Sequence, residues 1–119
     1  MGVDISSGVI NFCNRFYNTP GLSFKEGRAE KIPAGDAAFD AVVNVESARC
    51  YSDLKAFFSE VHRVLQPDGQ FLFADMIETD EVDDVREKLD ACGFTIVEEK
   101  NITPNVAKGL ELDNQRREK

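Results

Sequence analysis

Three polar side chains of this sequence stand where short apolar runs end, and they could bind a ligand there. Asp4, Asn44 and Asp75 each lie at or near the last residue of such a run. Open α/β sheets bind ligands beyond the carboxyl ends of their strands. A carboxylate offers two acceptor oxygens, so Asp4 could accept hydrogen bonds from two hydroxyl groups of one ligand. The structural alternatives are a helix-cap or turn acid for Asp4 and a strand-end turn residue for Asn44.

Metal and thiol chemistry find little support in the residue pattern. Cys13, Cys50 and Cys92 are far apart and form no C-x-x-C pair. His62 is the lone histidine and cannot complete a zinc site by itself. It lies within a helical pattern, where a surface position is expected in preference to a catalytic one. We therefore expect reduced thiols and no metal.

The charge balance argues against nucleic acid as a partner. The 119 residues carry a formal net charge of -8. Binding to phosphates needs Lys and Arg on one face, whereas the basic residues cluster only at Arg116, Arg117 and Lys119. No apolar run reaches the roughly 18 residues of a membrane span, and the first residues do not resemble a secretory signal. These features predict a soluble, cytoplasmic protein.

The elements that would position the polar side chains alternate between strand and helix patterns. A strand stub at 3–5 precedes helical spacing that ends before Pro20, since proline disfavours helical angles in the residue before it. Residues 22–26 alternate like a strand near a sheet edge. Residues 39–45 are nearly continuously apolar, which is typical of a strand covered on both faces.

The rear half continues this alternation. The sequence pattern predicts a helix over 54–65, a tight turn at 66–69 and a strand over 70–74. It then predicts a helix that ends at Gly93, a strand that begins at 94–97 and could extend to 102, and a last helix over about 105–116. In the last helix, at most Val106, Ala107 and Leu110 would be buried. The order predicts a single α/β domain over 1–119 with a mostly parallel sheet.

Four stretches, taken in order, contain sequence motifs of one family. They are G-V-D-I-S at 2–6, G-R-A-E-K-I-P at 27–33, F-D-A-V-V-N-V-E at 39–46 and E-V-H-R-V-L-Q-P-D-G at 60–69. In these stretches the chain resembles class I S-adenosylmethionine-dependent methyltransferases: their second strand, their G-D-A-E-x-L-P segment, their fourth strand and the turn before their fifth strand. The amino-acid sequence of residues 44–51 is most similar to that of sterol-type and of lipid or polyketide methyltransferases.

The resemblance implies a partial Rossmann-like methyltransferase sheet and S-adenosylmethionine as cofactor. The residues that it assigns to the cofactor are Asp4, Ile5, Arg28, Ala29, Glu30, Asn44 and Val45. Asp4 would bind the ribose, while Ile5 and Ile32 would cover the two faces of the adenine. Arg28 departs from the family, which usually has an adenine-binding Asp there. Because Arg only donates hydrogen bonds, that contact would be lost or reversed.

On the acceptor side, the resemblance implies a small or lipid-like molecule. Glu46, Tyr51 and Asp75 are the candidates near the loops that would face it. Each of the three has a structural or peripheral role as its alternative, so no catalytic residue is assigned.

The largest departure from the family is at the front of the chain. The family's first strand and G-x-G-x-G loop would precede Gly2, and its last strand is not recognisable either. A seven-stranded sheet of this type needs roughly 180 to 200 residues, against 119 here. The missing first strand would lie between the strands at 3–5 and 39–45. We expect these two strands to close up, or a homodimer or partner chain to cover their open edges.

Two function hypotheses follow from the sequence. The first is a methyltransferase-family enzyme, with cofactor binding dependent on what survives the truncation. The second is a non-catalytic remnant that serves as a binding or dimerising module. One half of a split enzyme, with the front supplied separately, is a third possibility.

Overall fold

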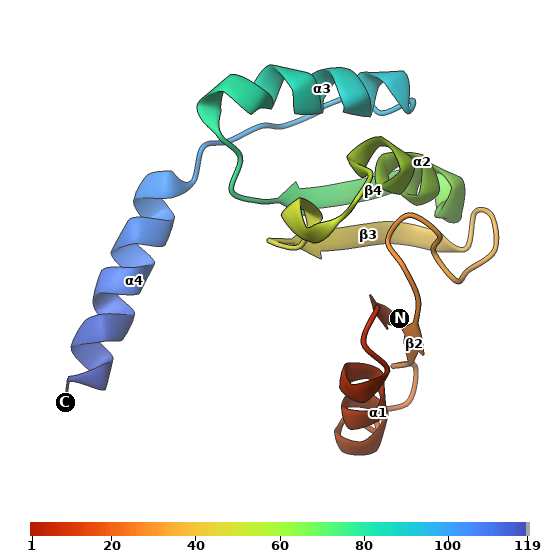
Figure 1. Cartoon of the computed structure of the whole chain (residues 1–119), viewed down its shortest axis with the longest axis horizontal. Helices are drawn as coiled ribbons and strands as arrows, with labels where there is room; N and C mark the ends of the chain where they lie inside the picture. Colours follow the sequence, from red (N-terminus) through yellow and green to blue (C-terminus); the bar gives the residue numbers. More distant parts are fainter. Residues whose placement is uncertain (119) are drawn as a thin grey trace.

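A computed structural model describes residues 1–118 as two small parallel sheets with four α-helices around them (Figure 1). The elements are β1 (Gly2–Asp4), α1 (Ser7–Phe16), β2 (Phe24–Glu26), β3 (Phe39–Val45), α2 (Leu54–Val64), β4 (Leu65–Ala74), α3 (Val82–Ala91) and α4 (Thr103–Arg117). Short 3-10 turns, η1 (Ala48–Cys50) and η2 (Thr79–Glu81), precede α2 and α3. No helix among these residues is long and apolar enough to cross a membrane.

Both sheets are parallel, as the sequence predicts. β1 pairs with β2, and β3 pairs with β4. The expectation that β1 closes up against β3 is wrong, because within residues 1–118 the two pairs remain separate sheets. The segment between β2 and β3 is hydrogen-bonded to Arg63 of α2 instead.

The main core lies between α2 and one face of the β3–β4 sheet. Phe58 and Val61 of α2 are fully buried. The ring of Phe58 meets those of Phe71 and Phe73 edge-on, with centroids 5.9 and 5.5 Å apart. This edge-to-face geometry is favoured between aromatic rings. The Asp53 side chain accepts a hydrogen bond from the Ala56 N–H and caps the start of α2.

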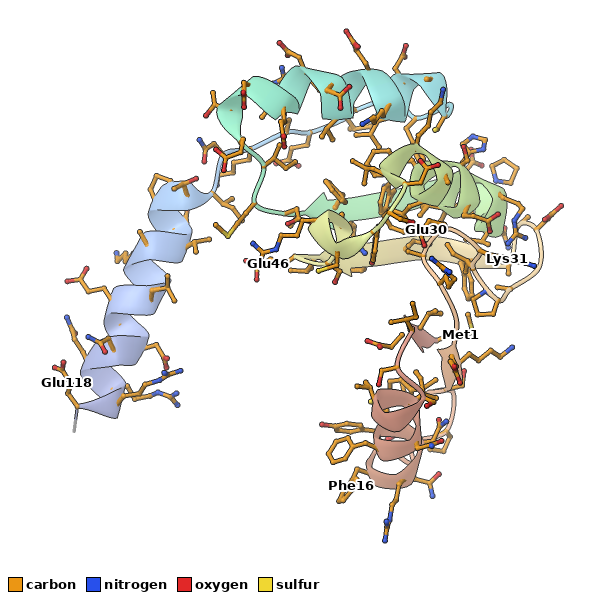
Figure 2. The ribbon with its side chains drawn as sticks, viewed as in Figure 1. Met1, Phe16, Glu30, Lys31, Glu46 and Glu118 are labelled. Atoms are coloured by element: carbon orange, nitrogen blue, oxygen red, sulfur yellow. The ribbon has the colours of Figure 1, made fainter. Side chains whose placement is uncertain are left out.

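α1 covers the small β1–β2 sheet and is largely exposed. Ser6 caps the helix by accepting a hydrogen bond from the Val9 N–H at 3.2 Å. Ile10 is its buried residue. Phe12 and Phe16 stack on each other with centroids 4.4 Å apart, and both remain more than half exposed. Figure 2 shows Phe16 at the end of α1 that points away from both sheets.

The tight turn expected at 66–69 lies inside β4. Phe39 pairs with Leu65, and Ala41 pairs with Gln70, so residues 66–69 oppose Asp40 alone. A Cβ on Gly69 would lie 2.9 Å from the Gln66 carbonyl oxygen. Only glycine therefore fits this close backbone approach without a shift.

The rear of the chain departs from the prediction. α3 ends at Ala91, and Gly93, expected to stop the helix, follows it with a left-handed φ of 93°. Residues 94–102 form no strand, because no strand of the described chain pairs with them. Arg86 of α3 instead donates to the Glu99 carboxylate at 2.9 Å and holds the segment against that helix. α4 begins at Thr103, earlier than expected, and has no buried residue.

Candidate functional site

Asp4, the expected ribose ligand, lies beside the loop that follows β2. Its carbonyl oxygen accepts a hydrogen bond from the Gly27 N–H at 2.9 Å. Its Oδ1 accepts from the Ser6 N–H at 2.8 Å, so Asp4 also has the turn role that was its structural alternative. A Cβ on Gly27 would lie 2.8 Å from Pro33, which explains why a glycine starts this loop. Asp4 and the loop therefore lie at one end of the small sheet.

Two side chains of α2 hold the loop from its other side. Glu60 accepts a hydrogen bond from the Ile32 N–H at 3.1 Å. The Arg63 guanidinium donates to the carbonyl oxygens of Ile32 and Ala34 at 3.0 and 2.8 Å. It also binds Glu60 and Asp36, and these two carboxylates raise the Arg63 pKa above its ordinary value. Five donors in one rigid plane allow a single Arg to make all these contacts.

Glu30 connects the loop to the start of α2. Its carboxylate accepts from the N–H and the hydroxyl of Ser52 at 2.8 and 3.1 Å. The backbone amide of Glu30 itself, followed by Ser52, lowers the pKa of this carboxyl. Arg28 lies 3.9 Å from Glu30 and is mostly exposed. Figure 2 shows Glu30 where the loop passes the larger sheet, whereas Lys31 points outward.

Asn44 has a partnerless oxygen near the end of β3. Its Nδ2 donates to the Tyr51 hydroxyl at 2.7 Å. Its Oδ1 is buried and is the one buried side-chain polar atom without a partner in the part of the chain described. Such an atom is costly to keep. Asn44 and Tyr51 therefore carry an unused hydrogen-bonding capacity at the carboxyl end of the larger sheet.

The other two acceptor-side candidates have structural partners. Asp75 accepts from the N–H groups of Ala48 and Met76 at 2.9 and 2.7 Å, so both of its oxygens hold backbone. Glu46 has a φ of 55° and donates its N–H to the Ala74 carbonyl oxygen. A left-handed backbone in a residue other than glycine is uncommon and often accompanies functional sites.

A small cavity of about 90 Å³ opens between η1, the end of β4 and α3. Its lining includes Ala48, Arg49, Leu54, Phe73, Asp75, Met76, Ile77, Glu81 and Val85. Asp75 is the only expected site residue among them. Asp4, Ile5, Arg28, Ala29, Glu30, Asn44 and Val45 do not line this cavity. Ile5 is 67% exposed. The residues present thus offer groups of the right type for adenosine but do not enclose it.

Three residues that position the loop were not predicted from the sequence: Ser52 and the pair Glu60 and Arg63. The E-x-x-R spacing could have indicated the pair, since residues three apart meet on a helix surface. Nothing in the local sequence points to their contacts with the loop, which join residues 28 to 31 positions apart. The described residues contain no group of side chains able to hold a metal ion.

Comparison with known sequences gives one family over most of these elements. The profile of the family described as "Methyltransferase domain" matches residues 1–73. A phthiotriol/phenolphthiotriol dimycocerosates methyltransferase of Mycobacterium tuberculosis is 34% identical over 97% of this chain. A fatty-acid O-methyltransferase of Mycolicibacterium smegmatis is 37% identical over 92%. The chain spans 43% and 40% of these two relatives, less than half of their length.

Solved structures share the fold. A Haloferax volcanii methyltransferase, in complex with the activator Trm112, matches 82% of this chain with a TM-score of 0.69 at 20% identity. This chain covers 51% of that one. The [4+2]-cyclase SpnF also matches 82% of the chain, with a TM-score of 0.65 at 21% identity. At these identities the likeness concerns the fold alone.

Proposed function

This chain belongs to the class I S-adenosylmethionine-dependent methyltransferase family, and from that premise we propose that it forms the adenosine-side and acceptor-side part of an enzyme that methylates a lipid-like small molecule. Relatives that are 34% and 37% identical are named for lipid acceptors. The name of the second specifies an oxygen as the methylated atom. We propose the same class of acceptor here.

One observation carries the proposal: hydrogen bonds and short chain segments link the expected cofactor residues Asp4, Glu30 and Asn44. Asp4 binds Gly27 at the start of the loop, and Glu30 in the loop binds Ser52. Ser52 directly follows Tyr51, which accepts a hydrogen bond from Asn44. Hydrogen bonds, together with the chain segments 27–30 and 51–52, thus connect the candidate ribose ligand to the partnerless amide at the end of β3. This arrangement would present adenosine-binding groups on one side and the acceptor site on the other.

Within this proposal, the chain's own residues bind and orient. The Asp4 carboxylate would accept from the ribose hydroxyls, and Asn44 and Tyr51 would hold a polar group of the cofactor or acceptor. S-adenosylmethionine, when bound, supplies an electrophilic methyl group. Methyl transfer depends mainly on the alignment of nucleophile and methyl, so positioning groups suffice for a large part of the rate.

The test is calorimetric titration of the chain with S-adenosylmethionine. We expect a dissociation constant of about 100 μM or tighter, equivalent to about -5.5 kcal/mol. Asp4→Ala should weaken binding, because it removes the ribose acceptor. Asp68→Ala is the matched control, since Asp68 is an exposed acid in the 66–69 turn. Equal affinities of the two variants would contradict the assignment of Asp4.

A non-catalytic binding module is the second candidate, and the exposure of the expected adenine contact Ile5 favours it. Fold does not define the reaction, since a cyclase shares this fold. The same titration separates the two. No heat of binding up to millimolar cofactor, from a chain that remains folded by circular dichroism, would support the binding module.

A further inference from the structure

The small cavity near the end of β4 combines an apolar lining with three charged side chains. Its apolar side chains come from α2, β4, the loop after β4 and α3, and they include Leu54, Phe73, Ile77 and Val85. The cavity lies at the carboxyl end of the larger sheet, where the arrowheads of β3 and β4 are side by side in Figure 1. An apolar lining with a few placed polar groups is typical of a site for a small molecule.

Two of the three charged side chains are already balanced within the protein. Both oxygens of Asp75 accept hydrogen bonds from backbone N–H groups. Glu81 directly precedes α3, where the helix dipole favours a negative charge. A hydrogen bond to Asp84 raises the pKa of Lys88 in the same helix, and the charge of Glu81 adds a smaller effect. Both carboxylates of the cavity therefore already face donors or a positive charge.

Arg49 is the third charged side chain and differs from the other two. It lies in η1, is exposed and forms part of the cavity lining. Arg63 and Arg86 each bind two carboxylates, whereas the Arg49 guanidinium has no ion pair or hydrogen bond within residues 1–118. The cavity thus presents one cation that is free to bind a ligand.

The hydrogen bonds of a guanidinium limit the group that Arg49 can bind. Arginine only donates hydrogen bonds, so it cannot bind an ammonium group. Its planar fork matches the two oxygens of a carboxylate, and such charge-assisted pairs are stronger than hydrogen bonds to a neutral alcohol. A phosphate monoester would bring up to two negative charges close to Asp75 and Glu81. A carboxylate, with a single charge, is therefore the best match.

We propose that this cavity binds the carboxylate end of a fatty-acid acceptor, with Arg49 on the carboxylate and the apolar side chains around the first carbons of the chain. The proposal rests on the proposed function and narrows the lipid-like acceptor to a carboxylic acid. A volume of about 90 Å³ takes only part of a long chain. Met76, which lines the cavity and is 69% exposed, offers a flexible apolar surface for the next carbons.

A carboxylate also suits the methyl transfer proposed for this chain. Carboxylic acids are ionised at pH 7, since their ordinary pKa is about 4, so the acceptor needs no general base. One carboxylate oxygen would form a bond to the methyl carbon of S-adenosylmethionine while the bond from that carbon to sulfur breaks and its electron pair goes to sulfur. The resulting methyl ester is neutral. Arg49 would hold it less strongly than the acid, which favours release of the product.

Octanoate, 1-octanol and octylammonium are the probes, because they share one chain and differ in the end group. The NMR signals of the Ile77 and Val85 methyl groups should shift and saturate with octanoate, since both residues line the cavity. Arg49→Gln should weaken octanoate binding at least about tenfold, because it removes hydrogen bonds between charged groups, and should leave 1-octanol binding unchanged. Arg15→Gln is the matched control, since Arg15 is an exposed arginine of α1 that does not line the cavity.

Four results would overturn the proposal: no shift of the cavity methyl signals with octanoate, equal losses in the two Gln variants, 1-octanol bound as tightly as octanoate, or octylammonium bound more tightly, which would assign the cavity to Glu81. The three ligands are compared on the unaltered chain, so this part of the test does not depend on the folding of a variant. Cofactor titration is scored separately. Octanoate binding without cofactor binding would remove the proposed function and keep the carboxylate site, and the reverse result would do the opposite.

Discussion

Replacing Asn44 by leucine should make the protein more stable. The buried Oδ1 of Asn44 has no partner among the described residues, and an unsatisfied buried polar atom costs about 1–3 kcal/mol. The hydrogen bond from Nδ2 to the Tyr51 hydroxyl contributes about 0.5–1.5 kcal/mol in return. Leucine has a similar branched shape and removes both effects. The penalty is the larger of the two, so Asn44→Leu should raise the free energy of unfolding by about 1 kcal/mol.

Urea unfolding measures this difference, with an unchanged slope showing that the two states keep their compactness. Tyr51→Phe is the companion variant. It removes the acceptor but leaves the whole amide in place, so it should lower stability by about 1 kcal/mol. A loss of stability on Asn44→Leu would refute the reasoning, because it would mean that the amide oxygen is satisfied in solution. If the proposed function holds, Asn44→Leu should also weaken cofactor binding while it stabilises the fold.

Three further predictions concern the fold around the site. Gly93→Ala should lower the free energy of unfolding by more than about 1–2 kcal/mol, because φ is 93° and the new Cβ would lie 2.9 Å from His62 Nε2. Gly21→Ala, at a φ of 82° in open space, should lower it in chemical unfolding by the backbone contribution alone. The lowered pKa of Glu30 means that its stabilisation is complete above its ordinary value of 4.5 and is lost as pH falls through the lower folded value. Unfolding curves of Glu30→Gln should therefore differ from the parent at pH 7 and converge with it in acid. Phe58→Ala should cost about 3–5 kcal/mol in the same assay, since the ring is fully buried.

Local pattern was sufficient for the elements that bury one face. The spacing of Phe57, Phe58 and Val61 predicts α2 and its core side, and the apolar run at 39–45 predicts β3. The F-T-I-V stretch after Gly93 has strand composition but no strand to pair with, so it forms none. β propensity reflects the surface that a residue packs against, and a local sequence does not contain that surface.

The candidate site likewise contains residues that the sequence predicts and contacts that it does not. Asp4 and Glu30 could be proposed from their places in recognisable stretches, and the structure brings both to the same loop. Arg63 lies in the recognisable stretch 60–69, but its position there does not indicate its contacts. Arg63 holds the loop by donating hydrogen bonds to carbonyl groups 29 and 31 positions earlier in the chain. A local stretch of sequence does not reveal contacts over such a separation.

The hydrogen bonds from Arg63 to the loop also set the order in which this region can form during synthesis. Ile32 and Ala34 leave the ribosome before Arg63, their partner in α2, has been made. Until about thirty more residues follow, the loop has no carbonyl-binding partner, and closing a segment of this length carries its own entropy cost. The loop after β2 can therefore gain these hydrogen bonds only once Arg63 has been made, even though the loop is encoded early.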